Sequence, residues 1–312
     1  MKALLAFALV VLVAPVLAPY PPERLFSGYQ YSPPMRPHVV DGGRLHFPFA
    51  YPVKPVDPIE RRFEEDRSRR VSSFDQSEPW FLLGSDALGR DVFSRLLTGA
   101  RLSLGLALLA TVATLCLGAL AGAAAAHFGG WVDSLLMRIA DFVVVLPGIY
   151  VVLVLRGAMP VVLSVQQVFT ALVVVLSLVA WPTVARGVRG ILVVERQAEY
   201  AEAARALGAS SWRLIARHLL PATRGFLGVQ ATLLVPAFVM AEATLSFAGL
   251  GFMPPTPSWG VMLLDAAAPR IVADAPWLLA PAAAIVITVA IVHWVTTSQN
   301  PPHASVSSTQ VI

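Results

Sequence analysis

The stretch EYAEAARALGASSWRLIARHLLP, which runs from Glu199 to Pro221, is the most informative part of the sequence. Apolar residues at helical spacing predict a short first helix. Its expected apolar face consists of Tyr200, Ala203, Ala204 and Leu207. Gly208 suits the left-handed turn that ends a helix, and Ser210 or Ser211 can cap a second helix that Pro221 stops. The stretch therefore predicts two short helices joined by a tight turn.

The apolar faces of this helical pair have two interpretations. The second helix presents Trp212, Ile215, Ala216 and Leu219. A helix pair with small alanines on one face fits a groove in another protein. The same pattern also fits a hairpin that packs on its own protein, and the pattern alone does not choose between them.

The charge around this stretch predicts its side of a membrane. Between Arg186 and Arg224 the chain carries seven arginines and three glutamates. Such an arginine excess in a loop of modest length is typical of the cytoplasmic side. We therefore expect residues 186–224 to form a cytoplasmic loop.

Long apolar runs lie on both sides of this loop. About 20 helical residues cross the hydrocarbon core of a bilayer. Spans are predicted near residues 101–126, 132–155, 167–185, 226–250 and 277–296. With the run Ala3–Ala18, which resembles either a first transmembrane helix or a signal peptide within residues 1–19, this gives six spans. Counting outward from the loop places both termini in the cytoplasm.

The composition agrees with a membrane protein. The 312 residues are 56% hydrophobic and only 13% charged, with a mean hydropathy of +0.69. The apolar runs lack the alternation of an outer-membrane barrel. The arginines do not form one broad basic face, so nucleic acid is not expected as a partner. The single cysteine, Cys116, excludes an internal disulfide and is expected to be a packing residue.

The remaining segments lie outside the predicted membrane domain, residues 99–296. Residues 20–98 form a proline-rich extracytoplasmic insertion after the first span. Alternation of Leu45, Phe47 and Phe49 predicts a short strand within it, and little other regular structure is expected there. Residues 297–312 form a C-terminal tail. The sequence thus predicts an all-α integral membrane protein that carries a small external subdomain.

Short motifs in the cytoplasmic loop resemble those of a known family. The motif residues are Glu202, Ala203, Ala204, Gly208, Leu220 and Pro221. Their order and spacing resemble the EAA loop by which permeases of ABC importers dock onto their ATPase subunits. The ending from Arg217 to Pro221 resembles the branch that transports dipeptides, oligopeptides and nickel. Three further segments resemble the same branch: Leu83–Leu104, Gly129–Pro147 and Ala241–Gly260.

The resemblance implies a C-type second permease component with the type I ABC importer fold. Its implied partners are a related B-type permease, two ABC ATPase subunits and an extracytoplasmic substrate-binding protein, in a bacterial inner membrane. ATP and Mg²⁺ are expected on the ATPases, because the chain has no GxxxxGK motif of its own. In the resemblance, Glu202 makes polar contacts, Ala203 and Ala204 allow close approach, and Gly208 forms the turn. Residues 20–80 are longer than usual for the branch, and the end after Trp294 lacks its charged residues.

Several residues of the predicted spans have interpretations of their own. Thr114, Gly118, Gly122 and Ala126 repeat at the small-xxx-small spacing of closely packed helices. Asp141 and Glu242 lie within apolar runs, where a charge normally faces a cavity or a partner. A pathway-lining role is open for each of them, but Arg138, three residues before Asp141, can neutralise that carboxylate, which favours a structural role for Asp141. Glu242 is a candidate for either structure or the translocation path, and Trp259 for either an interfacial anchor or a gate.

Other classes of function are left open. The histidines have no metal-ligand spacing, and no nucleophile motif occurs, so no catalytic or metal-binding residue is expected. One alternative is a membrane-anchored enzyme or receptor that works through residues 20–98, and another is an assembly scaffold without transport. Within the resembled branch, the substrate is a dipeptide, a longer peptide, nickel or another small solute.

Overall fold

The computed structural model describes residues 13–41, 44–57, 62–72, 79–148, 150–151, 153–154 and 163–299. The long helices are α2 (Val92–Phe128), α3 (Gly130–Val145), α5 (Val165–Glu195), α9 (Arg224–Phe247) and α12 (Ala280–Gln299). Shorter helices are η1 (Ala14–Leu17), α6 (Glu199–Ala206), α7 (Ser211–Leu214), η2 (Ile215–Leu219), α8 (Leu220–Ala222), α10 (Trp259–Asp265), α11 (Pro269–Asp274) and η3 (Pro276–Leu279). The strands are β1 (His38–Asp41), β2 (Arg44–Ala50), β3 (Val53–Asp57), β4 (Arg62–Glu65) and β5 (Val71–Ser72).

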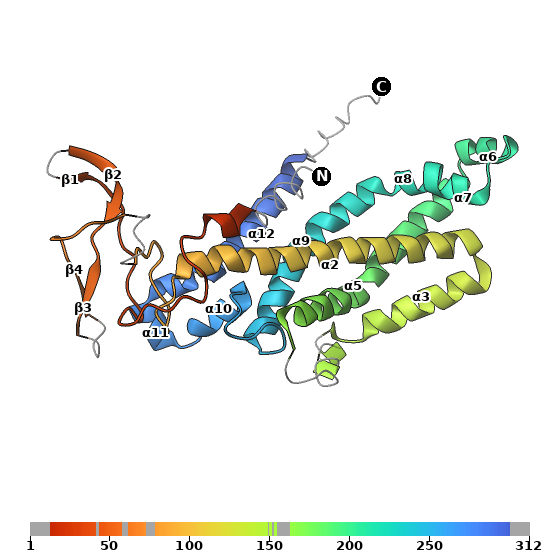
Figure 1. The fold of residues 1–312 in the computed structure, drawn as a ribbon. Helices are drawn as coiled ribbons and strands as arrows, with labels where there is room; N and C mark the ends of the chain where they lie inside the picture. The colour runs from red at the N-terminus through yellow and green to blue at the C-terminus, as the bar shows by residue number, and fades with distance from the viewer. Residues whose placement is uncertain are drawn as a thin grey trace, which may run out of the picture.

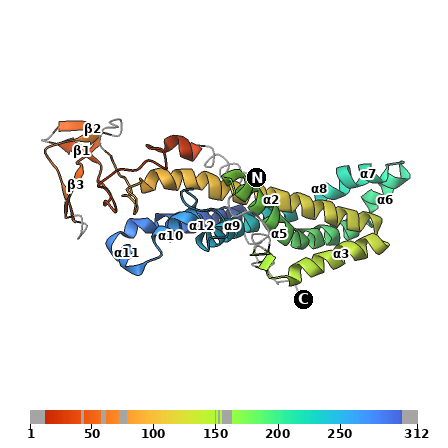
Figure 2. The same ribbon diagram turned by 60° about the horizontal axis from the view of Figure 1, so that its bottom comes forward.

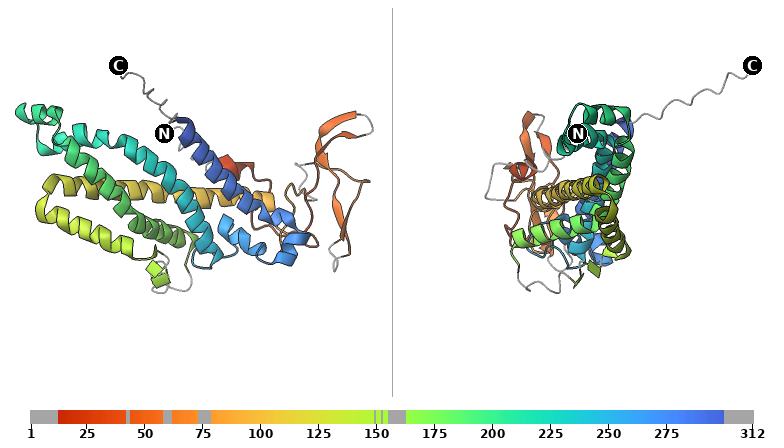
Figure 3. Two further views of the ribbon diagram at one scale, coloured as in Figure 1. Left: turned by 180° about the vertical axis from the view of Figure 1, so that it is seen from behind. Right: turned by 90° about the vertical axis from the view of Figure 1, so that its right-hand side faces the viewer.

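The molecule is elongated along its long helices. Figure 1 shows the strands at one end and the short helices α6 and α7 at the other. The same separation is seen after rotation in Figure 2 and from behind in Figure 3. The predicted external subdomain and the predicted cytoplasmic loop are therefore held apart by the length of the helical bundle.

Four helices are long and apolar enough to cross a membrane. They cover Val92–Phe128, Val165–Glu195, Arg224–Phe247 and Pro276–Trp294, and they confirm four of the six predicted spans. The predicted span 132–155 overlaps α3, which has 16 residues, and residues 149, 152 and 155 of that span lie outside the described residues. Residues 3–12 of the first predicted span also lie outside them. The count of six spans stays a prediction.

The ends of two helices differ from the prediction. Helix α2 begins at Val92 and α5 continues to Glu195. Hydropathy locates the apolar middle of a helix, whereas the backbone remains helical through polar residues as long as its hydrogen bonds continue. Residues 186–195 therefore belong to α5, and the cytoplasmic position of residues 186–224 stays a prediction.

Helix α2 is the centre of the bundle and packs against α5 through small residues. Thr114, Gly118, Gly122 and Ala126 are all buried, which confirms the packing interpretation of their spacing. A Cβ atom added to Gly118 would lie 2.5 Å from Val184 Cβ. Cys116 is exposed on the same helix, so its prediction as a packing residue was wrong. A residue two positions from a buried glycine lies on the opposite side of a helix.

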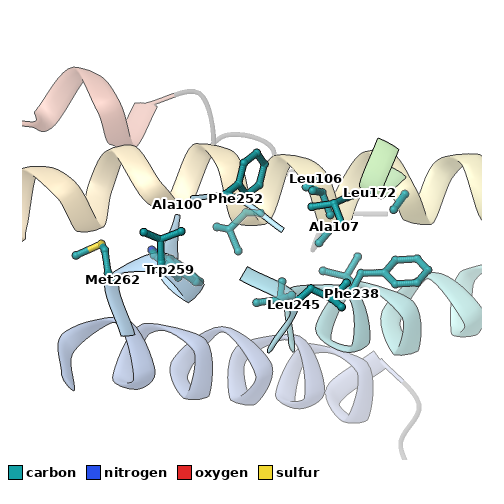
Figure 4. Packing of buried hydrophobic residues seen from close by; sticks show 14 of the residues in the cluster. Ala100, Leu106, Ala107, Leu172, Phe238, Leu245, Phe252, Trp259 and Met262 are labelled. Carbon is teal, nitrogen blue, oxygen red and sulfur yellow. The ribbon is translucent and has the colours of Figure 1, made fainter. Parts of the chain in front are cut away.

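The N-terminal half of α2 packs against α9 and α10. Figure 4 shows Ala100, Leu106 and Ala107 facing side chains of the other helices, among them Phe238, Leu245, Trp259 and Met262. These residues belong to one buried hydrophobic cluster. The alanines leave room for the large rings, so that α10 lies close to α2 without spanning the bundle itself.

A group of buried charges lies at the N-terminal end of α2. Arg90 Nε donates to Asp86 Oδ2 at 2.7 Å, and Arg95 lies 3.4 Å from the same carboxylate. Arg90 also lies 3.9 Å from Asp265 on α10. Arg90 and Arg95 run against the charge rule for an external segment. Their burial beside carboxylates explains why they are found there.

The predicted external subdomain is more regular than the sequence indicated. Strand β2 confirms the predicted strand, and it lies in an antiparallel sheet of order β1-β2-β5, while β3 and β4 form a second sheet. A small core of Met35, Ala50, Val53, Val71, Trp80 and Phe81 holds these strands. Trp80 N donates to Tyr20 Oη at 2.9 Å, and Tyr20 N to Ser94 Oγ at 3.1 Å. The subdomain is therefore fastened to the first turn of α2.

Candidate functional site

The loop between α5 and α9 folds as predicted at its turn. Helix α6 ends in two hydrogen bonds, from Gly208 N to Arg205 O at 2.9 Å and from Ala209 N to Ala204 O at 3.0 Å. This pair of bonds is the Schellman arrangement, which needs a left-handed residue after the helix. Gly208 supplies it with a φ of +79°. The structure thus confirms the conformation expected of Gly208.

The second helix of the loop continues further than predicted. Ser210 Oγ caps it by accepting a hydrogen bond from Arg213 N at 3.4 Å. Pro221 does not stop the helix, because the chain stays helical from α7 through η2 and α8. Element η2 is a π-helix, whose wider turn changes the hydrogen-bond register just before the proline, which has no N–H to donate. Leu220 and Pro221 are half-buried at the start of α8.

One face of the loop packs against the bundle. Ala201, Leu214 and Leu219 are buried in a cluster with Ala126 of α2 and Val184, Val188 and Leu192 of α5. Ala204 is half-buried against this cluster. The inward side of α6 is therefore marked by Ala201 and Ala204, and only Ala204 belongs to the predicted apolar face.

The rest of the predicted apolar face of α6 is exposed. Tyr200 is 42% and Leu207 89% exposed, and Ala203 is exposed beside them, as is Glu202. We call Tyr200, Ala203 and Leu207 the exposed loop face. Both interpretations of the sequence thus apply, each to a different side of one helix: the inner side packs on the bundle, and the outer side is free within the described chain.

Two arginines hold the loop in place: Arg196, which sequence reasoning did not single out, and Arg205, which it placed beside Glu202 as an i, i+3 pair. Arg196 Nη1 donates to the carbonyl oxygens of Ala126 at 3.0 Å and His127 at 3.2 Å. Arg205 Nη2 donates in turn to Arg196 O at 2.9 Å. Free carbonyls at helix ends are regular acceptors for arginine, so the position of Arg196 just after α5 was the available signal. These bonds tie the loop to the end of α2.

The side chain of Tyr200 is held by a hydrogen bond to Glu195, the last residue of α5. Its hydroxyl donates to Glu195 Oε2 at 2.6 Å. This bond stabilises the neutral phenol and raises the pKa of Tyr200 to about 12. The bond also limits the rotation of the ring, so that the aromatic part of the exposed loop face is presented in one orientation.

The two candidate path or gate residues meet in a buried polar cluster. Glu242 is fully buried on α9, and Ser246 Oγ donates to its Oε1 at 2.8 Å. Ser103 of α2 contacts the same carboxyl and accepts a hydrogen bond from Trp259 N at 3.1 Å. Trp259 Nε1 donates to Leu96 O at 3.0 Å. In this conformation both residues connect α2, α9 and α10, and a role in gating stays a prediction.

Asp141 has a different partner from the one predicted. Its Oδ1 lies 3.7 Å from Arg186 Nη2 on α5, with both side chains exposed. The pairing with Arg138 was expected from sequence proximity, but Arg138 lies on the same helix, and the ion pair that forms is between helices. Closer to the start of α3, Arg189 Nη2 donates to Asp133 Oδ2 at 2.6 Å.

The geometry defines a class of protein: a helical membrane component with a loop of short helices packed on the bundle at one end and a small folded subdomain at the other. Comparisons with known proteins give the family. Residues 115–301 match the family described as binding-protein-dependent transport system inner membrane component. The match covers more than half of the chain, so the protein belongs to this family.

Relatives of known description resemble most of the chain. A glutathione transport system permease protein of Pectobacterium atrosepticum is 35% identical over 237 residues, 76% of this chain and 74% of the relative. A putative peptide permease protein of Brucella ovis is 37% identical over 252 residues, 80% and 78% of the two chains. These similarities confirm the resemblance to the peptide branch.

A solved structure confirms the fold. An inward-facing conformation of the methionine ABC transporter MetNI aligns with a TM-score of 0.51 over 65% of this chain and 94% of that chain, at 19% sequence identity. At this identity the likeness concerns the fold alone. The protein is a permease subunit of an ABC importer with the type I permease fold, embedded in the inner membrane.

Proposed function

We propose that this permease subunit imports peptides by alternating access, and that residues 199–221 transmit the movement of partner ATPases to the bundle. The observation that carries the proposal is the exposed loop face on a helix that is otherwise firmly attached. Leu207 is 89% exposed, whereas Ala201 on the same helix is fully buried. A partner that presses on the outer side therefore moves α2 and α5 through the inner side.

The motif residues have distinct parts in this proposal. Glu202 is exposed and provides polar contacts to the ATPase, and Ala203 allows the partner to approach the helix closely. Ala204 and Gly208 keep α6 against the bundle and end it in a tight turn. Leu220 and Pro221 join the loop to α9, so that a displacement of the loop reaches the helix that carries Glu242.

The proposed assembly follows from the family. Its other components are a B-type permease, two ABC ATPase subunits that bind ATP and Mg²⁺, and an extracytoplasmic binding protein. The loop and both chain termini face the cytoplasm, because the loop carries the excess of arginine. The strands then lie outside, at the end of the molecule opposite α6 (Figure 1).

The substrate class rests on the described relatives. Their names refer to glutathione and to peptides, and we propose a small peptide, with nickel as the alternative within the branch. Uptake measured with the complete importer distinguishes them. Competition of a labelled tripeptide by other peptides supports the proposal, whereas uptake of nickel that peptides do not inhibit overturns it.

The docking role is tested by substituting one exposed residue. We expect Leu207→Glu to lower the recovery of the ATPase with the solubilised protein at least about tenfold, since a buried charge in the contact costs more than 1.4 kcal/mol. Recovery of the second permease should not change. Phe47→Glu, at a residue that is 88% exposed in the external subdomain, is the matched control. Equal ATPase recovery in both variants would remove the loop from the docking site.

A further inference from the structure

An exposed charged cluster lies within the helical bundle, on α3 and α5. Asp141 and Arg186 are 67% and 43% exposed at their side chains, and their charged atoms are 3.7 Å apart. Arg138 is exposed three residues before Asp141, which places it on the neighbouring turn of the same helix. Among the residues that the structure describes, Arg138 has no ion-pair partner. The cluster has two positive charges and one negative charge.

The cluster lies several turns away from the start of α3 and from the end of α5. Asp141 lies eleven residues beyond Gly130, the first residue of α3, which is a rise of about 16 Å. Arg186 lies nine residues before Glu195, the last residue of α5, or about 14 Å. The hydrocarbon core of a bilayer is about 30 Å thick. The ion pair therefore lies well away from the turn that joins α2 to α3.

A hydrocarbon environment is unfavourable for these three charged side chains. Charged side chains at this depth cost several kcal/mol when they face hydrocarbon, and they normally face a water-filled cavity or a polar partner. Immediate neighbours along the chain are apolar: Ala140 is buried against Trp181 and Ala185. The charges are thus presented on one side of a tightly packed pair of helices.

We propose that Arg138, Asp141 and Arg186 line the translocation path and bind the carboxylate of a peptide as it passes the inner half of the membrane. The net positive charge favours an anionic group, and a peptide has a carboxylate at its end. The separation of 3.7 Å in the ion pair exceeds hydrogen-bond distance, so Arg186 has donors free for a substrate. This inference rests on the proposed function and assigns a substrate contact to it.

The test uses cysteine chemistry in the complete importer. The only cysteine, Cys116, is first replaced by alanine, and Asp141→Cys is then treated with anionic and cationic methanethiosulfonates, which react with thiols in water. We expect both to react, and the anionic reagent to be favoured. Adding Arg186→Gln should lower the ratio of anionic to cationic rates about tenfold, because removing a charge about 6 Å away in water changes the two rates roughly threefold each, in opposite directions.

Control measurements distinguish a water-filled translocation path from lipid as the surroundings of the cluster. Ile287→Cys, at an apolar residue that is 57% exposed on the membrane-length helix α12, is the control for a position in contact with lipid and should be unreactive. Trapping the importer with ATP and vanadate should slow the reaction at Asp141→Cys, because the inner side of the path then closes. Arg186→Cys gives a second position should the first variant fold poorly.

Three results would overturn the inference. Absence of reaction at both positions would place the cluster against lipid or the second permease. Reaction without a preference for the anionic reagent would remove the carboxylate site, and reaction that trapping does not alter would place the cluster among lipid headgroups. All three can occur while Leu207→Glu still releases the ATPase, so failure here is distinguishable from failure of the docking role.

Discussion

Gly208 determines the turn between α6 and α7 in the proposed coupling loop, residues 199–221. Its φ of +79° lies in a region that costs a non-glycine residue about 1–3 kcal/mol, less for asparagine. A Cβ atom there would meet nothing within 4 Å, so the effect of substitution is conformational rather than steric. We expect Gly208→Val to reduce substrate-stimulated ATP hydrolysis and uptake, and Gly208→Asn to retain most of both.

The measurement is ATPase activity of the assembled importer with and without its loaded binding protein. Comparison of the two variants separates backbone strain from the loss of glycine as such. Equal activity of Gly208→Val and the wild type would contradict the role of this turn.

Asp91 should make the stability of the protein depend on pH. It caps α2 by accepting a hydrogen bond from Ser94 N at 2.8 Å. Burial penalises its charged form and raises its pKa from 3.8 to about 6. A carboxyl with a raised pKa contributes stability below its unfolded pKa, and this contribution is lost as the pH rises through the folded pKa. The loss should occur between about pH 4 and pH 6.

Asp91→Asn tests this dependence, because asparagine keeps the capping oxygen and does not ionise. The variant should be nearly as stable as the wild type at pH 4 and more stable at pH 7, by up to about 3 kcal/mol. Thermal unfolding in detergent at several pH values measures the difference. A difference that stays constant from pH 4 to pH 7 would show that Asp91 does not titrate in this range.

At the scale of elements, the contact between α2 and α5 depends on two glycines. A Cβ atom at Gly118 would lie 2.5 Å from Val184 Cβ, and one at Gly122 would lie 2.5 Å from Ala185 O. Each substitution by alanine should lower stability by about 1–3 kcal/mol, the usual effect of overpacking. Gly190→Ala is the control, because its Cβ would meet nothing within 4 Å. Thermal unfolding of the three variants should separate them, and equal midpoints would contradict this contact.

The sequence correctly predicted the features that depend on residues close together in the chain. The small-residue spacing on α2, the turn at Gly208 and the strand at Phe47 depend on neighbouring residues, and each was predicted. The continuation of α5 to Glu195 and the π-helix before Pro221 depend on hydrogen bonds between turns, which hydropathy does not report. Helix ends were therefore the weakest part of the prediction.

The same limit applies to the site. The motif from Glu202 to Pro221 drew attention to the loop between α5 and α9, but the pattern did not say which side of α6 faces the bundle. Contacts between distant segments were missed, such as Arg196 with the end of α2 and Asp141 with Arg186. Such pairs are created by the packing of α2, α3 and α5, and one sequence contains no record of that packing.

At the scale of the whole molecule, a different part of the chain is attached to each end of α2. The external subdomain is attached to α2 through Tyr20 and Ser94, and the coupling loop is attached to the other end of the same helix through Arg196. A single long helix of 37 residues thus links the two ends. Under the proposed orientation, this helix would connect the strands outside the membrane to the proposed ATPase contact on the cytoplasmic side.

The central claim is that partner ATPases drive import through residues 199–221. The most direct measurement is uptake of a labelled tripeptide by proteoliposomes that contain the complete importer, with ATP and the binding protein supplied. Uptake should require ATP in the wild type and in Phe47→Glu, and it should fall to the level without ATP in Leu207→Glu. Uptake by Leu207→Glu at the wild-type rate, or uptake by the wild type that does not require ATP, would contradict the account.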